Sequence, residues 1–359
     1  KIKQEVQNNT STKINLYPYA QITRNKKPDD VMGFYILHEG FIGVFDGELK
    51  EDDYDDIEEK KAVRNSDNGW LGITDKYWVT AIVPPKDKNF KSTFLYKDNF
   101  RANYILNSPV VIKPKSTSDN EVRLFVAAKE VETVDGYAES ENIEKFDLTI
   151  DWGWFYFFTK PLFFVIDYLF KFSGNFGIAI VLITLAIRVI FFPLANYSFR
   201  SMAKMKAVQP EMTRLKELHK EDKVKLQQEM MALYRKEKIN PASGCLPILI
   251  QIPFFFAIYK MLFISLEMRH QPFFGWIQDL SAKDPTTIFN LFGLIPWDPP
   301  GFLIIGIWPM MMGLSMYVQQ KLNPAPADPI QAKIFAFFPL FLTIILAPFP
   351  SGLVVYWTV

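Results

Sequence analysis

The chain has 359 residues, of which 49% are hydrophobic, and its formal net charge at pH 7 is +1. A charge so close to zero gives no support to a nucleic-acid-binding protein. The single cysteine, Cys245, cannot form an intrachain disulfide, and the three histidines are too scattered for a typical zinc site. The sequence opens at Lys1 without a signal peptide or initiator methionine, so we expect it to lack its own N-terminus.

Residues 1–150 are polar and rich in charge, and short β-branched and aromatic segments alternate there with turn-forming residues. This pattern predicts an all-β domain, in which we find no catalytic motif. The acidic stretch 48–59 lacks the regular ligand spacing of a calcium site, so we interpret it as a solvated loop. The expected strands cover residues 41–45, 78–83, 104–106, 109–112 and 123–127.

Residues 151–172 are rich in aromatic side chains but include Lys160, Pro161 and Asp167. These three interruptions argue against an uninterrupted membrane span. Aromatic residues on one face of a helix and charges on the other are typical of a segment lying in the membrane interface. We therefore predict an interfacial amphipathic helix.

Residues 173–194 are almost entirely apolar from 176 onward and predict a transmembrane helix with one charge inside it, Arg188. A charged side chain at the centre of a membrane helix costs roughly 3 kcal/mol or more. No acidic residue lies in any expected span to neutralise it, so Arg188 should face water or a polar cavity that opens toward the cytoplasm, ~10 Å from the inner helix end. Thr184 lies one turn earlier on the same face. Snorkelling to the interface and binding of a lipid headgroup are the alternatives.

Residues 195–243 are helical and strongly charged, with eleven basic residues against six acidic ones. Two apolar stripes, Met205–Val208–Met212–Leu215 and Val224–Gln227–Met231–Tyr234, indicate an antiparallel helical hairpin. The positive-inside rule makes this hairpin cytoplasmic and the β domain external. Its charges are either a solvated surface or a docking site, whose candidate residues are Arg214, Lys216, Lys220 and Lys223.

Residues 244–359 contain the remaining expected spans, at 246–266, 302–318 and 334–349, and the start of a further span at 353–359 that the chain cuts short. Gln251 and Lys260 are polar residues in the first of these spans. Met312 and Met316 in the next are either ordinary packing or an adaptable apolar surface.

The motifs of common enzymes are missing from the sequence, which has no HExxH, no GxSxG and no pair of acidic residues within the spans. We therefore predict a protein that is not an enzyme and needs no cofactor. A polytopic transporter that holds an anionic solute on Arg188 is the alternative function, although the expected spans show no inverted repeat.

Several stretches, taken in order, resemble the YidC/Oxa/Alb family of membrane protein insertases, and most closely its bacterial, Gram-negative YidC branch. The resemblance covers residues 149–359, and residues 1–150 resemble the C-terminal part of the YidC periplasmic β-sandwich. The matching stretches are GNFGIAIVLITLAIRVIFFPL at 174–194, SMAKMKAVQPEM at 201–212, LQQEMMALYRKEKINPASGCLPILIQIPFFFAIYK at 226–260, QDLSAKDP at 278–285 and FPSGLVVYW at 349–357.

This resemblance implies a polytopic α-helical membrane protein with a five-helix insertase core, whose last helix is truncated, preceded by a partial periplasmic β-supersandwich. It implies an insertase and chaperone of the bacterial inner membrane, acting alone or with the SecYEG translocon on nascent membrane protein clients. The cytoplasmic hairpin would receive clients from the ribosome and a targeting receptor, and membrane lipids would surround the core. A hydrophilic groove open to the cytoplasm would be lined by Arg188, Thr184, Gln251, Tyr356 and Trp357, with Lys260, Met312 and Met316 as possible further lining residues.

Overall fold

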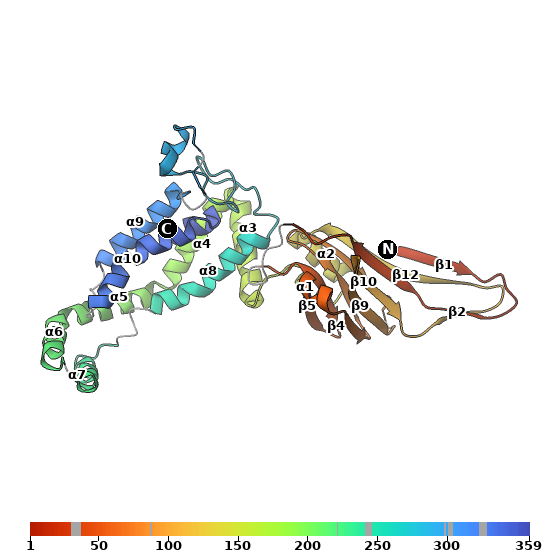
Figure 1. Cartoon of the computed structure of the whole chain (residues 1–359), viewed down its shortest axis with the longest axis horizontal. Helices are drawn as coiled ribbons and strands as arrows, with labels where there is room; N and C mark the ends of the chain where they lie inside the picture. The colour runs from red at the N-terminus through yellow and green to blue at the C-terminus, as the bar shows by residue number, and fades with distance from the viewer. Residues whose placement is uncertain are drawn as a thin grey trace. The chain divides into compact units, whose positions relative to one another are not determined.

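The computed structural model describes residues 1–29, 37–86, 88–220, 222–240, 246–297, 299–300, 304–322 and 329–359. The chain forms two compact units, which are described separately (Figure 1). The first comprises residues 1–154 with 264–267, and the second comprises residues 155–263 with 268–359. Cys245 lies outside the described residues.

The first unit is built on two larger antiparallel sheets and one short strand pair, which confirms the predicted β-sandwich. All five segments expected to be extended contribute to strands. The six-stranded sheet has the order β1 (Ile2–Gln7), β12 (Thr117–Ala128), β8 (Trp78–Val83), β7 (Gly69–Thr74), β4 (Gly40–Phe45), β5 (Glu48–Asp53). The four-stranded sheet has the order β3 (Tyr19–Arg24), β10 (Asn99–Leu106), β9 (Phe90–Lys97), β6 (Ala62–Ser66), and β11 (Val110–Ile112) pairs with β2 (Ile14–Leu16).

Aromatic side chains fill the space between the two larger sheets. Phe41 of β4 lies 5.0 Å from Phe94 of β9, measured between ring centroids, and both are fully buried. The opposite face of the six-stranded sheet is covered by α2 (Val131–Ser140) and the short 3-10 helix η1 (Phe146–Thr149), where Phe146 packs edge-on against Trp70 at 5.3 Å. Because both faces of β4 and β7 are covered, every residue of these two strands is buried.

The acidic stretch 48–59 is β5 followed by helix α1 (Tyr54–Glu59), so its prediction as a solvated loop is wrong. The strand follows β4 through a two-residue turn, in which Asp46 and Gly47 have φ of 51° and 79°. Asp-Gly is the pair that such hairpin turns favour. Tyr54 and Ile57 anchor the stretch because both are buried in the sandwich core. The prediction relied on the many acidic residues of the stretch and gave too little weight to these two apolar residues.

The second unit begins with α3 (Tyr156–Ser173) and α4 (Phe176–Ile190), which pack against each other. Gly174 ends α3 in the left-handed conformation at φ 71°, and the Asn175 side chain caps α4 by accepting from Ile178 N at 3.1 Å. The rings of Phe170 and Phe176 stack across this turn at 3.8 Å. The exposed side of α3 is aromatic and carries Tyr156, Phe157, Phe164, Tyr168 and Phe172. The location of α3 in a membrane interface stays a prediction.

The single helix expected over residues 173–194 is broken, which corrects the prediction. Helix α4 ends at Ile190, and α5 (Phe192–Ala207) departs from it at 61°. The cause is Pro193, which has no N–H to donate and whose ring excludes a continuous helix. Among the described residues, no single helix is long and apolar enough to cross a membrane, and the bent α4–α5 pair reaches that length and composition only as a pair. Shorter apolar helices occupy 249–264 and 333–346.

The charged segment folds as α6 (Gln209–Leu218) and α7 (Lys223–Lys236), which lie against each other (green in Figure 1). The first apolar stripe faces the partner helix as predicted, since Met212 is buried and its sulfur lies 3.9 Å from the Tyr234 hydroxyl. The second stripe is wrong at Val224, Gln227 and Met231, which are all exposed. The half-buried residues of α7 instead include Leu226, Met230 and Leu233.

Close packing through small residues joins the remaining helices, α8 (Leu246–Ile264), α9 (Ile307–Leu322), α10 (Pro329–Leu346) and α11 (Ser351–Thr358). A β-carbon added to Gly352 of α11 would lie 2.9 Å from Leu262 of α8 and 3.2 Å from Ile180 of α4. At Gly313 of α9 it would lie 2.1 Å from the Thr343 hydroxyl of α10. Small residues therefore allow these helices to approach closely, as is usual for membrane helices.

The Asp46 carboxylate predicts how acid affects the β domain. It accepts hydrogen bonds from Asp67 N, Asn68 N and the Ser66 hydroxyl, and the bond from Asp67 is the main reason that the pKa of Asp46 is lowered below its ordinary 3.8. A lowered pKa means that this contribution to stability is present above the ordinary value and is lost as the pH falls through the folded-state value. We expect Asp46→Asn to weaken the acid dependence of hydrogen-exchange protection factors in β4–β7 of the full chain. Asp67→Asn is the matched control, because the exposed Asp67 carboxylate accepts no hydrogen bond within the described residues; equal effects of the two variants would contradict the assignment.

Candidate functional site

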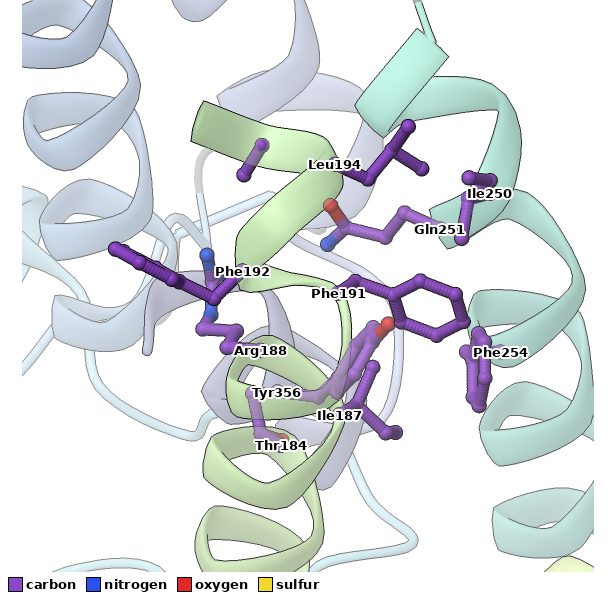
Figure 2. A pocket seen from close by; sticks show the side chains of 11 residues that line it. Thr184, Ile187, Arg188, Phe191, Phe192, Leu194, Ile250, Gln251, Phe254 and Tyr356 are labelled. Carbon is purple, nitrogen blue, oxygen red and sulfur yellow. The ribbon is translucent and has the colours of Figure 1, made fainter. Parts of the chain in front are cut away.

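A cavity of about 240 Å³ lies where the end of α4, the start of α5, the first half of α8 and the last helix α11 meet (Figure 2). Its walls are apolar apart from four side chains, one or two from each of three helices. The polar lining residues are Thr184, Arg188, Gln251 and Tyr356, and the apolar ones are Ile187, Phe191, Phe192, Leu194, Ala195, Ile250 and Phe254.

The break at Phe191 shapes this cavity. Because α5 turns away at 61°, the last turn of α4 and the first turn of α5 form two adjoining walls. Phe191 in the break packs edge-on against Phe254 of α8 at 5.8 Å, and Phe254 packs against Phe158 of α3 at 4.8 Å. We did not predict this aromatic wall, and the sequence signal that could have revealed it is Pro193.

Arg188 lies in the last turn of α4, two residues before the helix ends at Ile190. This position corrects the expectation that it lies well inside a longer helix. The last carbonyls of a helix have no helical partner and carry partial negative charge, so they favour a cation there. The Arg188 side chain is exposed, and it forms no ion pair with any of the residues described. Its positive charge is therefore available at the edge of the cavity.

The other three polar groups differ in what they can offer to a ligand. Thr184 is 2% exposed and donates its hydroxyl to the Ile180 carbonyl at 2.6 Å, so its hydrogen is used within its own helix. Tyr356 is 1% exposed, and the side chains of Gln251 and Arg188 both lie close enough to influence its hydroxyl electrostatically. Figure 2 shows the three side chains around the cavity. Arg188, Gln251 and Tyr356 thus come from three helices to form one polar group.

Four predicted groove residues do not line this cavity. Trp357, Met312 and Met316 belong to a separate apolar cluster, in which Met312 is fully buried and Trp357 packs edge-on against Phe255 at 5.2 Å. For the two methionines, these contacts favour ordinary packing over an adaptable apolar surface. Lys260 is half-buried on α8 and is not a lining residue.

The four predicted docking residues lie on or beside the α6–α7 hairpin. Arg214 is exposed and pairs with Glu211 at 3.3 Å one turn earlier, Lys216 is half-buried, and Lys220 is exposed. Lys223 begins α7, and its side chain lies outside the described part of the chain. Within the described residues, no cluster of three or more His, Cys, Asp or Glu side chains could hold a metal ion.

The arrangement is that of a helical unit with a cavity, joined in one chain to a β-sandwich, and comparisons with known sequences give its class. The family described as 60Kd inner membrane protein matches residues 168–359, and the YidC periplasmic domain matches residues 1–165. The chain belongs to the 60Kd inner membrane protein family. It is an inner-membrane protein with a periplasmic β domain.

Curated relatives are similar over nearly all of the chain. The Membrane protein insertase YidC of Pelagibacter ubique is 62% identical over 99% of this chain and 64% of the relative. Its namesakes in Brucella melitensis and Methylorubrum extorquens are each 50% identical, over 98% and 99% of this chain. The chain spans 58% and 60% of those two relatives. A solved structure, "Active YidC insertase crystal structure with the first transmembrane domain resolved", aligns with 89% of this chain and 80% of its own at 19% identity and a TM-score of 0.46.

The cavity beside Arg188 predicts a sharp change in water access between neighbouring positions of α4. Arg188 borders the cavity, whereas Val189 is 73% exposed and is not one of the lining residues. We expect Arg188→Cys, in a Cys245→Ser background and in liposomes, to react at least about tenfold faster with a charged thiol reagent than Val189→Cys, because the reactive thiolate needs water. Equal rates at the two positions would contradict an aqueous cavity, and Ile180→Cys, at a fully buried position, gives the unreactive baseline.

Proposed function

We propose that this chain is a membrane protein insertase and chaperone that moves client segments into the inner membrane through a polar groove open to the cytoplasm. The observation that carries the proposal is Arg188, which is exposed beside a cavity and forms no ion pair within the described residues. The names of the relatives, each a membrane protein insertase, support the same function. No chemical step and no cofactor are needed.

The mechanism begins with electrostatic attraction between a client and the groove. The short, acidic tail of a client enters the cavity and meets Arg188, where two opposite charges 4 Å apart attract by about 4 kcal/mol at an effective dielectric of 20, against about 1 kcal/mol in water. Gln251 and Tyr356 offer polar groups beside that charge. Polar parts of the client are therefore spared part of the cost of crossing hydrocarbon.

The apolar segment of the client completes the insertion. It passes from the groove into lipid, and each Å² of apolar surface removed from water contributes roughly 25 cal/mol. The free energy comes from this transfer, so the chain itself consumes no nucleotide. With the SecYEG translocon as partner, the same groove would receive segments that leave the channel sideways.

The hairpin of α6 and α7 would receive clients on the cytoplasmic side. Arg214, Lys216, Lys220 and Lys223 give it a basic surface suited to the ribosome, whose RNA is anionic, or to a targeting receptor. Contact with phosphates in such a docking reaction would be strongly salt-dependent and would not read a nucleic-acid sequence.

Replacing Arg188 tests the electrostatic role. We expect Arg188→Ala to lower the insertion rate of a single-span client with an acidic tail by about tenfold in liposomes, because the attractive charge is lost, while Arg188→Lys retains most of the rate. The matched control is the same client with its acidic tail residues changed to Asn and Gln, on which Arg188→Ala should have little effect.

Two results would contradict this function. One is equal insertion of the acidic client by Arg188→Ala and wild type. The other is saturable flux of a small anion into liposomes that contain only this protein, without client insertion, which the transporter alternative predicts.

Charge reversal on the hairpin tests docking. Arg214→Glu, Lys216→Glu and Lys220→Glu together are expected to reduce co-sedimentation with ribosomes about tenfold at moderate salt, because three phosphate-attracting charges become repulsive. Glu211→Gln, Glu217→Gln and Glu229→Gln form the control, since they change acidic residues of the same hairpin. Unchanged co-sedimentation of the triple reversal would reject the hairpin as the docking site.

A further inference from the structure

One loop in the second unit contacts the first turns of three helices. This anchoring loop, residues 268–287, follows the end of α8 and precedes α9 in the chain. The first turns of helices expose N–H groups that have no helical acceptor, and such groups need partners when they are buried. The anchoring loop supplies these acceptors from two side chains, Asp284 and Thr286, and from two backbone carbonyls.

Asp284 is the side chain in question, and it is 1% exposed. Its Oδ2 accepts from Trp308 N at 3.0 Å, in the first turn of α9. Its Oδ1 accepts from Trp276 Nε1 at 3.2 Å, from Thr286 N at 3.0 Å and from the Thr286 hydroxyl at 2.6 Å. The Thr286 hydroxyl in turn accepts from Ile307 N at 3.0 Å. A buried carboxylate with four donors at a helix N-terminus is strongly favoured by charge and by hydrogen bonding.

The same loop holds α11, which carries Tyr356. Ser351 donates to the Ala282 carbonyl from both its backbone N, at 2.7 Å, and its hydroxyl, at 2.8 Å. Gly352 N donates to the Leu280 carbonyl at 3.0 Å. The start of α11 is therefore fixed to residues that lie two and four positions before Asp284 in the sequence.

Helix α4, which carries Arg188, is fixed through another residue of the loop. The Asn175 side chain donates to the Phe273 carbonyl at 3.2 Å, and a β-carbon at Gly177 would lie 2.0 Å from the Phe273 ring. The Phe273 ring also packs against Trp308 of α9 at 5.8 Å. Two of the three helices that bear polar groups of the cavity, α4 and α11, thus share one anchor.

Helix α9 has no side chain of its own at its cap. Gly306 occupies the N-cap, since its carbonyl accepts from Met310 N at 3.2 Å. A β-carbon at Gly306 would lie 2.3 Å from Cγ of Asp284, so the Asp284 carboxylate fills the space in which a local cap would sit. In most helices the capping side chain belongs to the N-cap residue itself. Here it belongs to Asp284, which lies 22 residues before the N-cap residue Gly306.

We propose that Asp284 is a positioning residue for the groove. By capping α9 from the anchoring loop, it holds the loop that also fixes α11 and α4, and so keeps Tyr356 in place beside Arg188. The consequence for client insertion rests on the proposed function, whereas the consequence for helix position does not.

Asp279 provides a matched control within the same loop. Its Oδ1 accepts from His270 N at 3.1 Å, Ser281 N at 2.8 Å and the Ser281 hydroxyl at 2.6 Å, and its Oδ2 lies 3.0 Å from His270 Nδ1. It is therefore a partly buried carboxylate with as many partners as Asp284. All of these partners lie in the loop, and none belongs to the first turn of a helix.

The experiment moves the cap from the loop to the helix. Full-length chains in liposomes carry spin labels at Leu185 of α4 and Leu314 of α9, both exposed, in a Cys245→Ser background. We expect Asp284→Ala to broaden the distance distribution between the labels and to slow client insertion about tenfold. Gly306→Asp alone should also do harm, because it collides with Asp284. Combined, the two substitutions should restore a narrow distribution and bring the insertion rate to within about twofold of wild type, because the local cap replaces the remote one.

Several results would overturn the positioning role: a wild-type label distance and rate in Asp284→Ala, an equal loss in Asp279→Asn, or a double variant worse than either single one. Asp284→Asn, which keeps the side-chain volume, carries the test if Asp284→Ala does not accumulate. Label distances that follow the expected pattern in a protein that inserts no client would refute the proposed function and support the positioning role.

Discussion

Pro193 has no backbone N–H, and the lack of this hydrogen-bond donor determines where α4 ends and how the cavity of the helical unit forms. It ends α4 at Ile190 and sends α5 away at 61°. The bend opens the cavity and brings Arg188 into the last turn of α4, where the negative end of the helix dipole lowers the cost of holding a cation. An uninterrupted helix would have put the same guanidinium deeper inside an apolar segment, at greater cost.

The two ends of α4 are controlled in different ways. Its last turn is free of ion pairs among the described residues and borders a cavity, whereas its first turn is held by the Asn175 cap and by the anchoring loop. The same loop supplies acceptors to α9 and α11. These helices therefore have an apolar-walled cavity at one end while the other end is held by the loop.

Much of the fold was predictable from local pattern. Short β-branched segments gave the strands that the structure contains, and the three-to-four-residue rhythm around Met212 gave the first helix of the hairpin. Where the sequence pattern gave a wrong prediction, a few apolar residues determined the structure of a mostly polar segment. Tyr54 and Ile57 anchor an acidic stretch in the core. In α7, apolar residues occur in two overlapping registers, and the sequence pattern alone did not show which of them is buried.

The sequence by itself determined that an arginine without an acidic partner lies in an apolar segment, that a basic hairpin follows it, and that a β domain precedes both. Those conclusions depend on composition and spacing along the chain, which do not depend on how the helices are arranged in space. The family resemblance implied one groove lined by Arg188, Gln251, Tyr356 and Trp357, and only the tertiary structure decided that the first three meet at one cavity while Trp357 and Met312 pack elsewhere. It also decided that Asp284 caps α9 by accepting from Trp308 N, 24 residues later in the chain. Both depend on contacts between segments distant in the chain, which local pattern does not encode.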